Sequence, residues 1–270
     1  MEQNEKIVLF APHQDDEVIS AFLYLEEQKQ KGNQVSVIFA TNGDYQGRNI
    51  ASVRAEESIK ALSRIGISQD DIYFMGYADT GMHPSKSFLF RLYHSGIQQV
   101  LSAPYSSYTY HPLNGETVHH IFYGKEAPYT KYSFYQDIRM IIRLLCPDIL
   151  LIPFCFDFHG GHQALGKSIQ EIVENNHLNI PRYSYLIHAG NDWTWPNRKG
   201  NTFICPEIIS KQQWKKRVIF SFPEEKIEQK KKAIQLFITQ QPTSQNNYLN
   251  SFAKAEEIFL REDLFSPSSE

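Results

Sequence analysis

Apolar and polar positions alternate along the first half of the chain in a pattern that predicts strands separated by helices. Apolar runs at 7–10, 34–40 and 71–77 are typical of buried strands. Between them, residues 18–31 and 51–65 carry apolar side chains at helical spacing. Because helices of this length separate the strands, we expect right-handed parallel β-α-β units.

The same rhythm resumes in the second half. The predicted helices are 135–145, 163–174 and 224–240, and the predicted strands are 148–153 and 182–188. We find no internal repeat and no linker, so we expect a single domain over residues 1–270. The fold class is therefore α/β, with three layers around a mostly parallel sheet.

One segment, 82–133, breaks this rhythm. It is rich in Tyr, His, Ser and Pro and has weak periodicity. We expect a partly ordered insertion over the carboxyl edge of the sheet, where contacts to a substrate would lie.

The composition excludes several functions. The chain has 270 residues, 41% of them apolar and 21% charged, with a formal net charge of −3. This balance gives no case for nucleic-acid binding. No apolar stretch is long enough for a transmembrane segment, and the polar first residues do not resemble a signal peptide. Three scattered cysteines indicate no disulfide framework, so we expect a cytoplasmic protein. The oligomeric state stays open.

Two clusters of imidazoles and carboxylates each follow a predicted strand. Residues 12–17 (Pro-His-Gln-Asp-Asp-Glu) follow the first strand, and residues 157–162 (Asp-Phe-His-Gly-Gly-His) follow the strand at 148–153. Open α/β sheets bind their ligands at the carboxyl ends of strands, so the two clusters can converge on one metal ion. Either cluster alone could be a helix cap or a chance spacing; the pair indicates a metal-dependent hydrolase.

The residue types suggest how the roles divide. His13, Asp16 and His162 form a ligand set of the kind that catalytic Zn²⁺ uses, and Fe²⁺ or Co²⁺ would fit as well. Consecutive side chains diverge, so Asp15 is left free to act as a general base. His159 would then stabilise the oxyanion that develops on a substrate carbonyl.

Further motifs extend this pattern along the chain. They are Thr41-Asn42-Gly43-Asp44, Arg54-Ala55-Glu56-Glu57, Met75-Gly76-Tyr77, Asp79, Pro147-Asp148-Ile149, Asp192-Trp193-Thr194-Trp195-Pro196 and the helix at 230–238. Together with the two clusters they resemble the PIG-L/LmbE-like N-acetylglucosaminyl deacetylases. The resemblance covers most of the chain except 82–133.

This resemblance implies a Rossmann-like fold and a divalent metal, usually zinc. It implies hydrolysis of the acetamide of an N-acetylglucosamine-type sugar or conjugate. The implied partner is thus a small N-acetylated amino sugar or glycoconjugate. Position by position, His13, Asp16 and His162 match the metal ligands of the family.

The same comparison implies the other roles. Asp15 matches the base that activates water and returns the proton to the amine, and His159 matches the electrophilic partner at the oxyanion. Arg54 and Asp79 match positions that contact the sugar in members of the family.

The chain departs from the family pattern in two places. Gln14 replaces the usual Pro, and Gly160-Gly161 replace the usual Pro-Asp, whose acid orients the catalytic His. Asp157 is the nearest candidate to orient His159 instead.

Two groups of residues have more than one interpretation. His188 could line the pocket or be structural. The aromatic side chains of Trp193, Trp195, Tyr105, Tyr108 and Tyr110 could stack on a sugar or anchor the core and loops.

Three other functions compete with a deacetylase acting on N-acetylglucosamine compounds. They are a catalytically weak sugar-binding protein on the same scaffold, an amidase for a different sugar conjugate, and a nucleotide-binding enzyme. The last is disfavoured because the first strand-helix turn lacks the G-x-G-x-x-G pattern.

Overall fold

The computed structural model describes residues 4–190, 193, 195–196, 200–241 and 248–261. Within these residues, seven strands form one sheet in the order β3-β2-β1-β4-β5-β7-β6. The strands are β1 (Lys6–Ala11), β2 (Gln34–Thr41), β3 (Ile72–Tyr77), β4 (Ile149–Pro153), β5 (Arg182–Tyr185), β6 (Val218–Ser221) and β7 (Glu256–Arg261). Strands β1 to β5 are parallel, and β7 runs antiparallel to both β5 and β6. The predicted α/β class with a mostly parallel sheet is confirmed.

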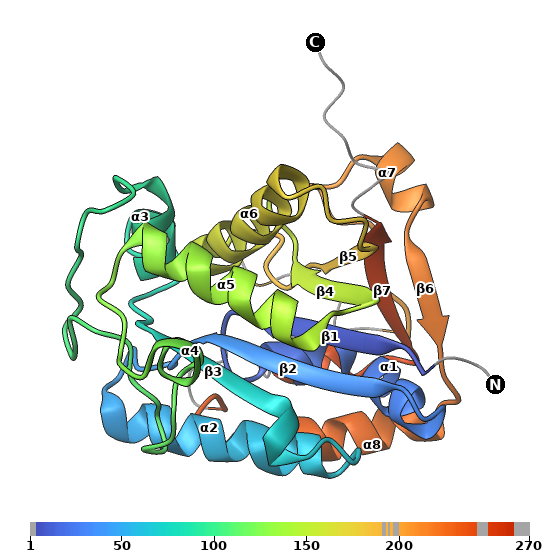
Figure 1. Cartoon of the computed structure of the whole chain (residues 1–270). Coiled ribbons are helices and arrows are strands. Elements are labelled where there is room, and N and C mark those ends of the chain that lie inside the picture. The colour runs from blue at the N-terminus through green and yellow to red at the C-terminus, as the bar shows by residue number, and fades with distance from the viewer. Residues whose placement is uncertain (1–3, 191–192, 194, 197–199, 242–247, 262–270) are drawn as a thin grey trace.

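Helices cover both faces of this sheet (Figure 1). One face packs against α1 (Asp16–Gln30), α2 (Arg48–Ser63), α8 (Glu225–Ile234) and the 3₁₀ helix η3 (Leu249–Phe252). The other face packs against α3 (Phe88–His94), α4 (Val118–Tyr123), α5 (Lys131–Leu145) and α6 (Gly160–Asn175). The short elements η1 (Gln69–Asp71) and α7 (Lys211–Lys215) precede β3 and β6. None of the described helices has the length and apolar character needed to cross a bilayer.

Strand β1 explains why the sequence reads as a continuous apolar run. Ile7, Leu9 and Ala11 point into the core on the α1 side, whereas Val8 and Phe10 point into the core on the α5 side. Side chains alternate between the two faces of a strand, so a strand covered on both faces has no polar positions.

The order of the strands brings the two sequence clusters together. From β1 the chain builds outward to β2 and β3, then returns and places β4 on the opposite side of β1, with Leu9 paired to Leu151. The crevice between the carboxyl ends of β1 and β4 is therefore the switch point of the sheet, where ligands bind in such folds. Residues 12–17 leave β1 at this crevice, and residues 157–162 form the end of the loop after β4 and the first turn of α6.

The segment 82–133 is more regular than its sequence indicates. It contains α3 and α4, and α5 begins inside its predicted limits at Lys131. The segment also docks on β3, because the Tyr110 amide donates to the Gly76 carbonyl. Gly76 has a φ of 80°, and a Cβ there would lie 2.7 Å from the Tyr110 carbonyl oxygen, so this close contact requires glycine.

The sequence did not predict β6 and β7, the two strands that form the antiparallel edge of the sheet. In β7, Glu257 is buried, and its carboxylate accepts hydrogen bonds from the Leu23 and Tyr24 amides and from the Lys230 ammonium. Because a buried acid interrupts the apolar pattern of this strand, the pattern alone does not predict the strand. Two predicted elements are also too long: β5 ends at Tyr185 rather than 188, and α8 ends at Ile234 rather than 240.

Candidate active site

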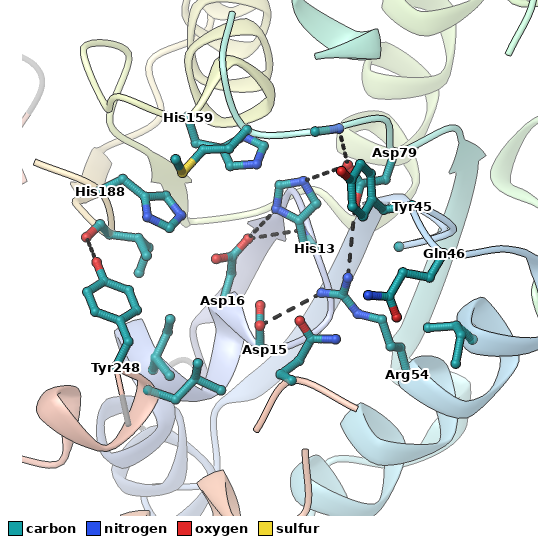
Figure 2. Close-up of a pocket in the computed structure, with 18 of the residues that line it drawn as sticks. His13, Asp15, Asp16, Tyr45, Gln46, Arg54, Asp79, His159, His188 and Tyr248 are labelled. Carbon is teal, nitrogen blue, oxygen red and sulfur yellow. Dashed lines mark hydrogen bonds and ion pairs between the residues drawn. The ribbon is translucent and has the colours of Figure 1, made fainter. Parts of the chain in front are cut away.

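A cavity of about 310 Å³ lies at the switch point (Figure 2). The residues that line it are His13, Asp15, Asp16, Ile19, Gly43, Tyr45, Gln46, Ile50, Arg54, Asp79, Gly81, Met82, His159, Ile187, His188, Trp193, Gln240, Tyr248 and Leu249. They come from the loops after β1, β2, β3, β4 and β5, from the first turns of α1 and α2, from the segment after α8 and from the start of η3. Of the segment 82–133, only Met82 is among these lining residues, so the segment contributes less to the cavity than expected.

The loop after β1 turns two consecutive carboxylates in different directions. Asp15 has a φ of 136°, a conformation that residues other than glycine rarely adopt. The Glu17 carboxylate accepts the Asp15 amide at 2.9 Å and the Ser58 hydroxyl at 2.7 Å. These two hydrogen bonds hold the unusual backbone between Asp15 and the start of α1 at Asp16.

Asp16 faces two imidazoles. Its Oδ2 lies 3.2 Å from His13 Nδ1 and 3.2 Å from His162 Nε2, and it also accepts the His13 amide at 2.9 Å. Burial acts to raise the pKa of Asp16, but His162 and His13 outweigh it and hold that pKa well below its usual value. Asp16 is therefore an ionised carboxylate beside two imidazole nitrogens.

Asp15 faces the other way, toward a cation. Its Oδ2 lies 3.7 Å from Arg54 Nη2, and Arg54 Nη1 lies 3.9 Å from Asp79 Oδ2. Asp79 in turn lies 3.8 Å from His13 Nε2. Burial raises the pKa of Asp15 well above its usual value, and Arg54 offsets this only in part. The two adjacent acids thus have pKa values shifted in opposite directions, as expected for groups with different roles.

His162 lies in the first turn of α6, completely buried, and neither ring nitrogen makes a hydrogen bond to any described residue. Burial acts to lower the pKa of His162, but the carboxylates of Asp16 and Asp157 raise it to about 10. The site therefore favours a positive charge at this ring. A buried imidazole without a hydrogen bond, an ionised carboxylate and a second imidazole are the donors that a divalent metal prefers, so the residues present fit a metal ion.

His159 caps the N-terminus of α6 with its own ring. The ring Nδ1 accepts the Gly161 amide at 3.0 Å, so this nitrogen carries a lone pair and the proton of the neutral ring is on Nε2. Burial and the surrounding imidazoles lower the pKa of His159 well below its usual value. His159 is thus a neutral N–H donor whose ring centroid lies 4.5 Å from that of His13.

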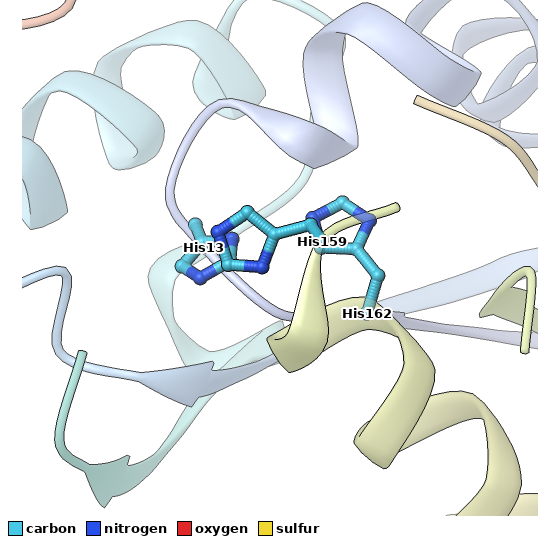
Figure 3. Close-up of side chains that lie close together, drawn as sticks. All are labelled: His13, His159 and His162. Carbon is cyan, nitrogen blue, oxygen red and sulfur yellow. The ribbon is translucent and has the colours of Figure 1, made fainter. Parts of the chain in front are cut away.

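Three imidazoles cluster at this point (Figure 3). Among the residues that the structure describes, one nitrogen from each of His13, His159 and His162 lies within 4.8 Å of the other two. Asp16 contacts two of the three rings. These four side chains, which the sequence assigned to the site, are the residues that could hold a metal.

Asp157 lies behind His162. Its Oδ2 is 3.4 Å from His162 Nδ1 and accepts the Ile187 and His188 amides at 2.9 Å each. Its Oδ1 accepts the backbone amide of His159 at 2.8 Å. The sequence linked Asp157 to the His159 ring, but the carboxylate instead faces the His162 ring. A carboxylate behind a histidine commonly fixes the ring of a metal ligand.

Three cavity residues have little or no signal in the sequence. His188 follows β5, and burial lowers its pKa to about 4, so its ring is neutral. Tyr248 stacks on His188 with a centroid distance of 5.9 Å and an interplanar angle of 10°. Tyr248 and Gln240 belong to no motif, and packing alone brings them to the cavity.

The sequence allowed two interpretations of its aromatic residues, sugar stacking in the pocket or anchoring of the core and loops, and the two tryptophans differ in this respect. Trp193 lines the cavity, whereas Trp195 packs against Phe203 and Phe252 in the core. The tyrosines of segment 82–133 are outside the cavity lining. Part of the predicted aromatic loop, at 191–192, 194 and 197–199, lies outside the described residues.

The fold and the site together define an α/β protein with a His/Asp centre at the switch point of its sheet. The family profile of PIG-L, described as GlcNAc-PI de-N-acetylase, matches residues 8–173. The match spans more than half of the chain, and the chain belongs to this family. No curated protein sequence matches it.

Solved structures share the fold. N,N'-diacetylchitobiose deacetylase from Pyrococcus horikoshii is 17% identical with a TM-score of 0.59, covering 96% of this chain and 84% of its own. A deacetylase of an antimicrobial pseudoaglycone is 15% identical with a TM-score of 0.59, covering 96% and 97%. The zinc-inhibited form of a teicoplanin deacetylase is 16% identical with a TM-score of 0.57, covering 97% and 99%.

Proposed function

We propose that this protein is a metal-dependent N-deacetylase that hydrolyses the acetamide of an N-acetylglucosamine-type sugar or conjugate. The observation that carries the proposal is the convergence of His13, Asp16 and His162 beside Asp15, a second carboxylate with a raised pKa. Family membership and the deacetylases that share the fold support it. In the reaction, water adds to the acyl carbon, the C–N bond breaks, and acetate and a free amine leave.

His13, Asp16 and His162 would hold the metal, which we propose to be Zn²⁺, with Fe²⁺ and Co²⁺ as alternatives. When bound, a divalent cation polarises the substrate carbonyl and acidifies the attacking water. His159 is left out of this ligand set because its Nδ1 already accepts the Gly161 amide and its Nε2 carries the proton.

Asp15 would act as the general base and then as the acid. Its carboxylate is buried beside the proposed ligands without facing them, because the backbone at Asp15 turns it toward Arg54. Burial raises its pKa, which makes it a stronger base for the water proton, and the proton that it gains in this step is the one that it returns to the leaving nitrogen.

His159 would stabilise the oxyanion. Its neutral ring keeps a proton on Nε2, and a fixed N–H donor at this point lowers the energy of the negative charge that develops on the carbonyl oxygen. Arg54 and Asp79, next to Asp15, would bind the sugar hydroxyls. N,N'-diacetylchitobiose, named for one neighbour, is a compound of this chemistry.

A sugar-binding protein with weak catalysis is the second candidate, since Gly161 stands where the family has an acid. The Gly161 amide nevertheless orients the His159 ring without that acid. The predicted cytoplasmic location and the single domain stay part of the proposal, and cell fractionation would test the former.

The experiment is acetate release from N-acetylglucosamine compounds by the zinc-loaded protein, compared with Asp15→Asn. We expect Asp15→Asn to lower kcat by about 10²–10⁴-fold while bound metal stays constant. Asp70→Asn, a carboxylate outside the cavity lining, serves as the matched control and should keep full activity. For the wild type, kcat/KM should rise as Asp15 loses its proton, at a pH above the ordinary aspartate range. Bound metal with no acetate release from any compound would favour the sugar-binding protein.

A further inference from the structure

Two walls of different chemistry face each other across the cavity. The charged wall is formed by Asp15, Arg54 and Asp79, and the apolar wall by Ile187, His188, Trp193, Tyr248 and Leu249. Figure 2 shows His188 and Tyr248 on one side of His13 and Asp16, and Arg54 and Asp79 on the other. The proposed metal ligands therefore lie between the two walls.

Contacts among its own side chains hold the apolar wall together. The Tyr248 hydroxyl donates to the Ile187 carbonyl at 2.6 Å, which connects the residue before η3 to the loop after β5. The Trp193 ring stands edge-on to Tyr248 at a centroid distance of 4.7 Å and lies 5.3 Å from His188. Leu249 follows Tyr248 and is almost completely buried, yet it lines the cavity.

The position of the base gives the substrate a direction. Asp15 lies 3.7 Å from Arg54, so the nitrogen that receives a proton from Asp15 belongs on the side of the charged wall. The other substituent of the amide carbonyl must then point away from Arg54. On that side, the His188 ring lies 5.4 Å from His159 and 5.2 Å from His162.

We propose that the apolar wall binds the acyl chain of the amide, and that the enzyme removes N-acyl groups longer than acetyl from amino sugars, with Leu249 limiting their length. This inference rests on the proposed function. A methyl group could contact only a small part of a wall built from five side chains. Each further methylene that is buried should raise kcat/KM by up to about fourfold, until the chain reaches the end of the wall.

The test compares kcat/KM for N-acetyl-, N-propionyl-, N-butyryl- and N-hexanoylglucosamine, followed by release of the free amine. We expect the wild type to cleave the butyryl compound at least as well as the acetyl compound. Leu249→Phe should lower the hexanoyl-to-acetyl ratio by about tenfold or more, and Leu249→Ala should raise it. Since the two variants shift the ratio in opposite directions, a variant that fails to fold leaves the other to decide.

Ile50→Ala is the matched control. Ile50 also lines the cavity, but it lies on α2 one turn before Arg54, so its truncation should leave the hexanoyl-to-acetyl ratio unchanged. Calorimetric binding of N-hexanoylglucosamine to Asp15→Asn, with and without Leu249→Phe, gives a readout that needs no turnover. We expect tighter binding than for the acetyl compound, and a loss with Leu249→Phe.

Three results would overturn the inference. Hydrolysis of the acetyl compound alone, with no response to Leu249, would leave the deacetylase intact and remove the acyl subsite. A response to Leu249 with the octyl glycoside of N-acetylglucosamine, and none in the acyl series, would assign the wall to the group on the anomeric oxygen. No amine release from any compound would overturn the proposed function as well.

Discussion

Two loops meet at the cavity, one between β1 and α1 and the other between β4 and α6, and each gives two like side chains different environments in a different way. Each carries a pair of like groups with opposite pKa shifts: Asp15 and Asp16 after β1, and His159 and His162 around the start of α6. In the first loop the backbone separates the pair, because the φ of 136° at Asp15 turns its carboxylate away from the imidazoles that Asp16 contacts. In the second loop the separation comes from hydrogen bonding and charge.

In that second loop, the Gly161 amide occupies Nδ1 of His159 and leaves a neutral N–H donor. His162 has no such hydrogen bond and lies between two carboxylates, Asp16 and Asp157. Opposite pKa shifts result, downward for His159 and upward to about 10 for His162. One backbone angle, or one amide, is therefore enough to give like groups that are close in sequence different environments.

The first prediction tests the difference between His159 and His162 in the second loop. His159→Ala should lower kcat by about 10²–10³-fold, because it removes the proposed donor to the oxyanion. Bound metal, measured by elemental analysis, should stay at the wild-type level. His159→Gln, which can place an amide N–H near the original Nε2, should recover part of the activity. Loss of metal from His159→Ala would instead make the three-imidazole cluster the metal site.

A smaller effect is expected from Asp157→Asn, which removes the carboxylate behind His162. Metal affinity, measured by competition with a chelator, should fall by about 10–100-fold, since a neutral amide no longer supports the ligand ring. At saturating metal, kcat and its pH profile should stay close to those of the wild type. If the pH profile of kcat shifts while metal affinity does not change, then Asp157 acts on His159, as the sequence suggested.

A further prediction concerns the first loop. Glu17→Met removes both the hydrogen bond to the Asp15 amide and the one to Ser58, so Asp15 should lose its fixed direction. We expect kcat to fall by up to about 10²-fold with little change in KM. Glu17→Gln can still accept the Asp15 amide through its oxygen and donate to Ser58, and it should keep most of the activity. Equal losses in the two variants would deny Glu17 this positioning role.

The wild type and Glu17→Gln together also test how the free energy of unfolding depends on pH. Burial raises the pKa of Glu17 from 4.5 to about 7 in the folded protein. Between these values the folded state binds more protons than the unfolded state, so this group makes the free energy of unfolding fall as the pH rises. Glu17→Gln should remove this contribution, and thermal melts of wild type and variant over that window, at equal metal loading, would measure it.

Much of the parallel part of the fold was predictable from local pattern. Strands β1 and β4 are buried on both faces, so each is an almost continuous apolar run, and β2 interrupts its apolar positions only with Ser36; such patterns need no tertiary information. Strand β7 was missed because Glu257 replaces an apolar core residue, and its charge is balanced by Lys230 from α8. The helices of 82–133 were missed because they are only one or two turns long and are stabilised by burial of residues such as Phe88 and Leu92.

By itself, the sequence determined which chemical groups stand at the ends of β1 and β4, and the adjacency of Asp15 and Asp16 already required their side chains to diverge. Only the tertiary structure decided the rest of the site. Asp157 could be assigned to the His162 ring, and His188 and Tyr248 to a wall of the cavity, only after β4 and β5 were packed side by side with η3 nearby. Partners from distant segments meet through packing, and no short stretch of sequence contains the information that brings them together.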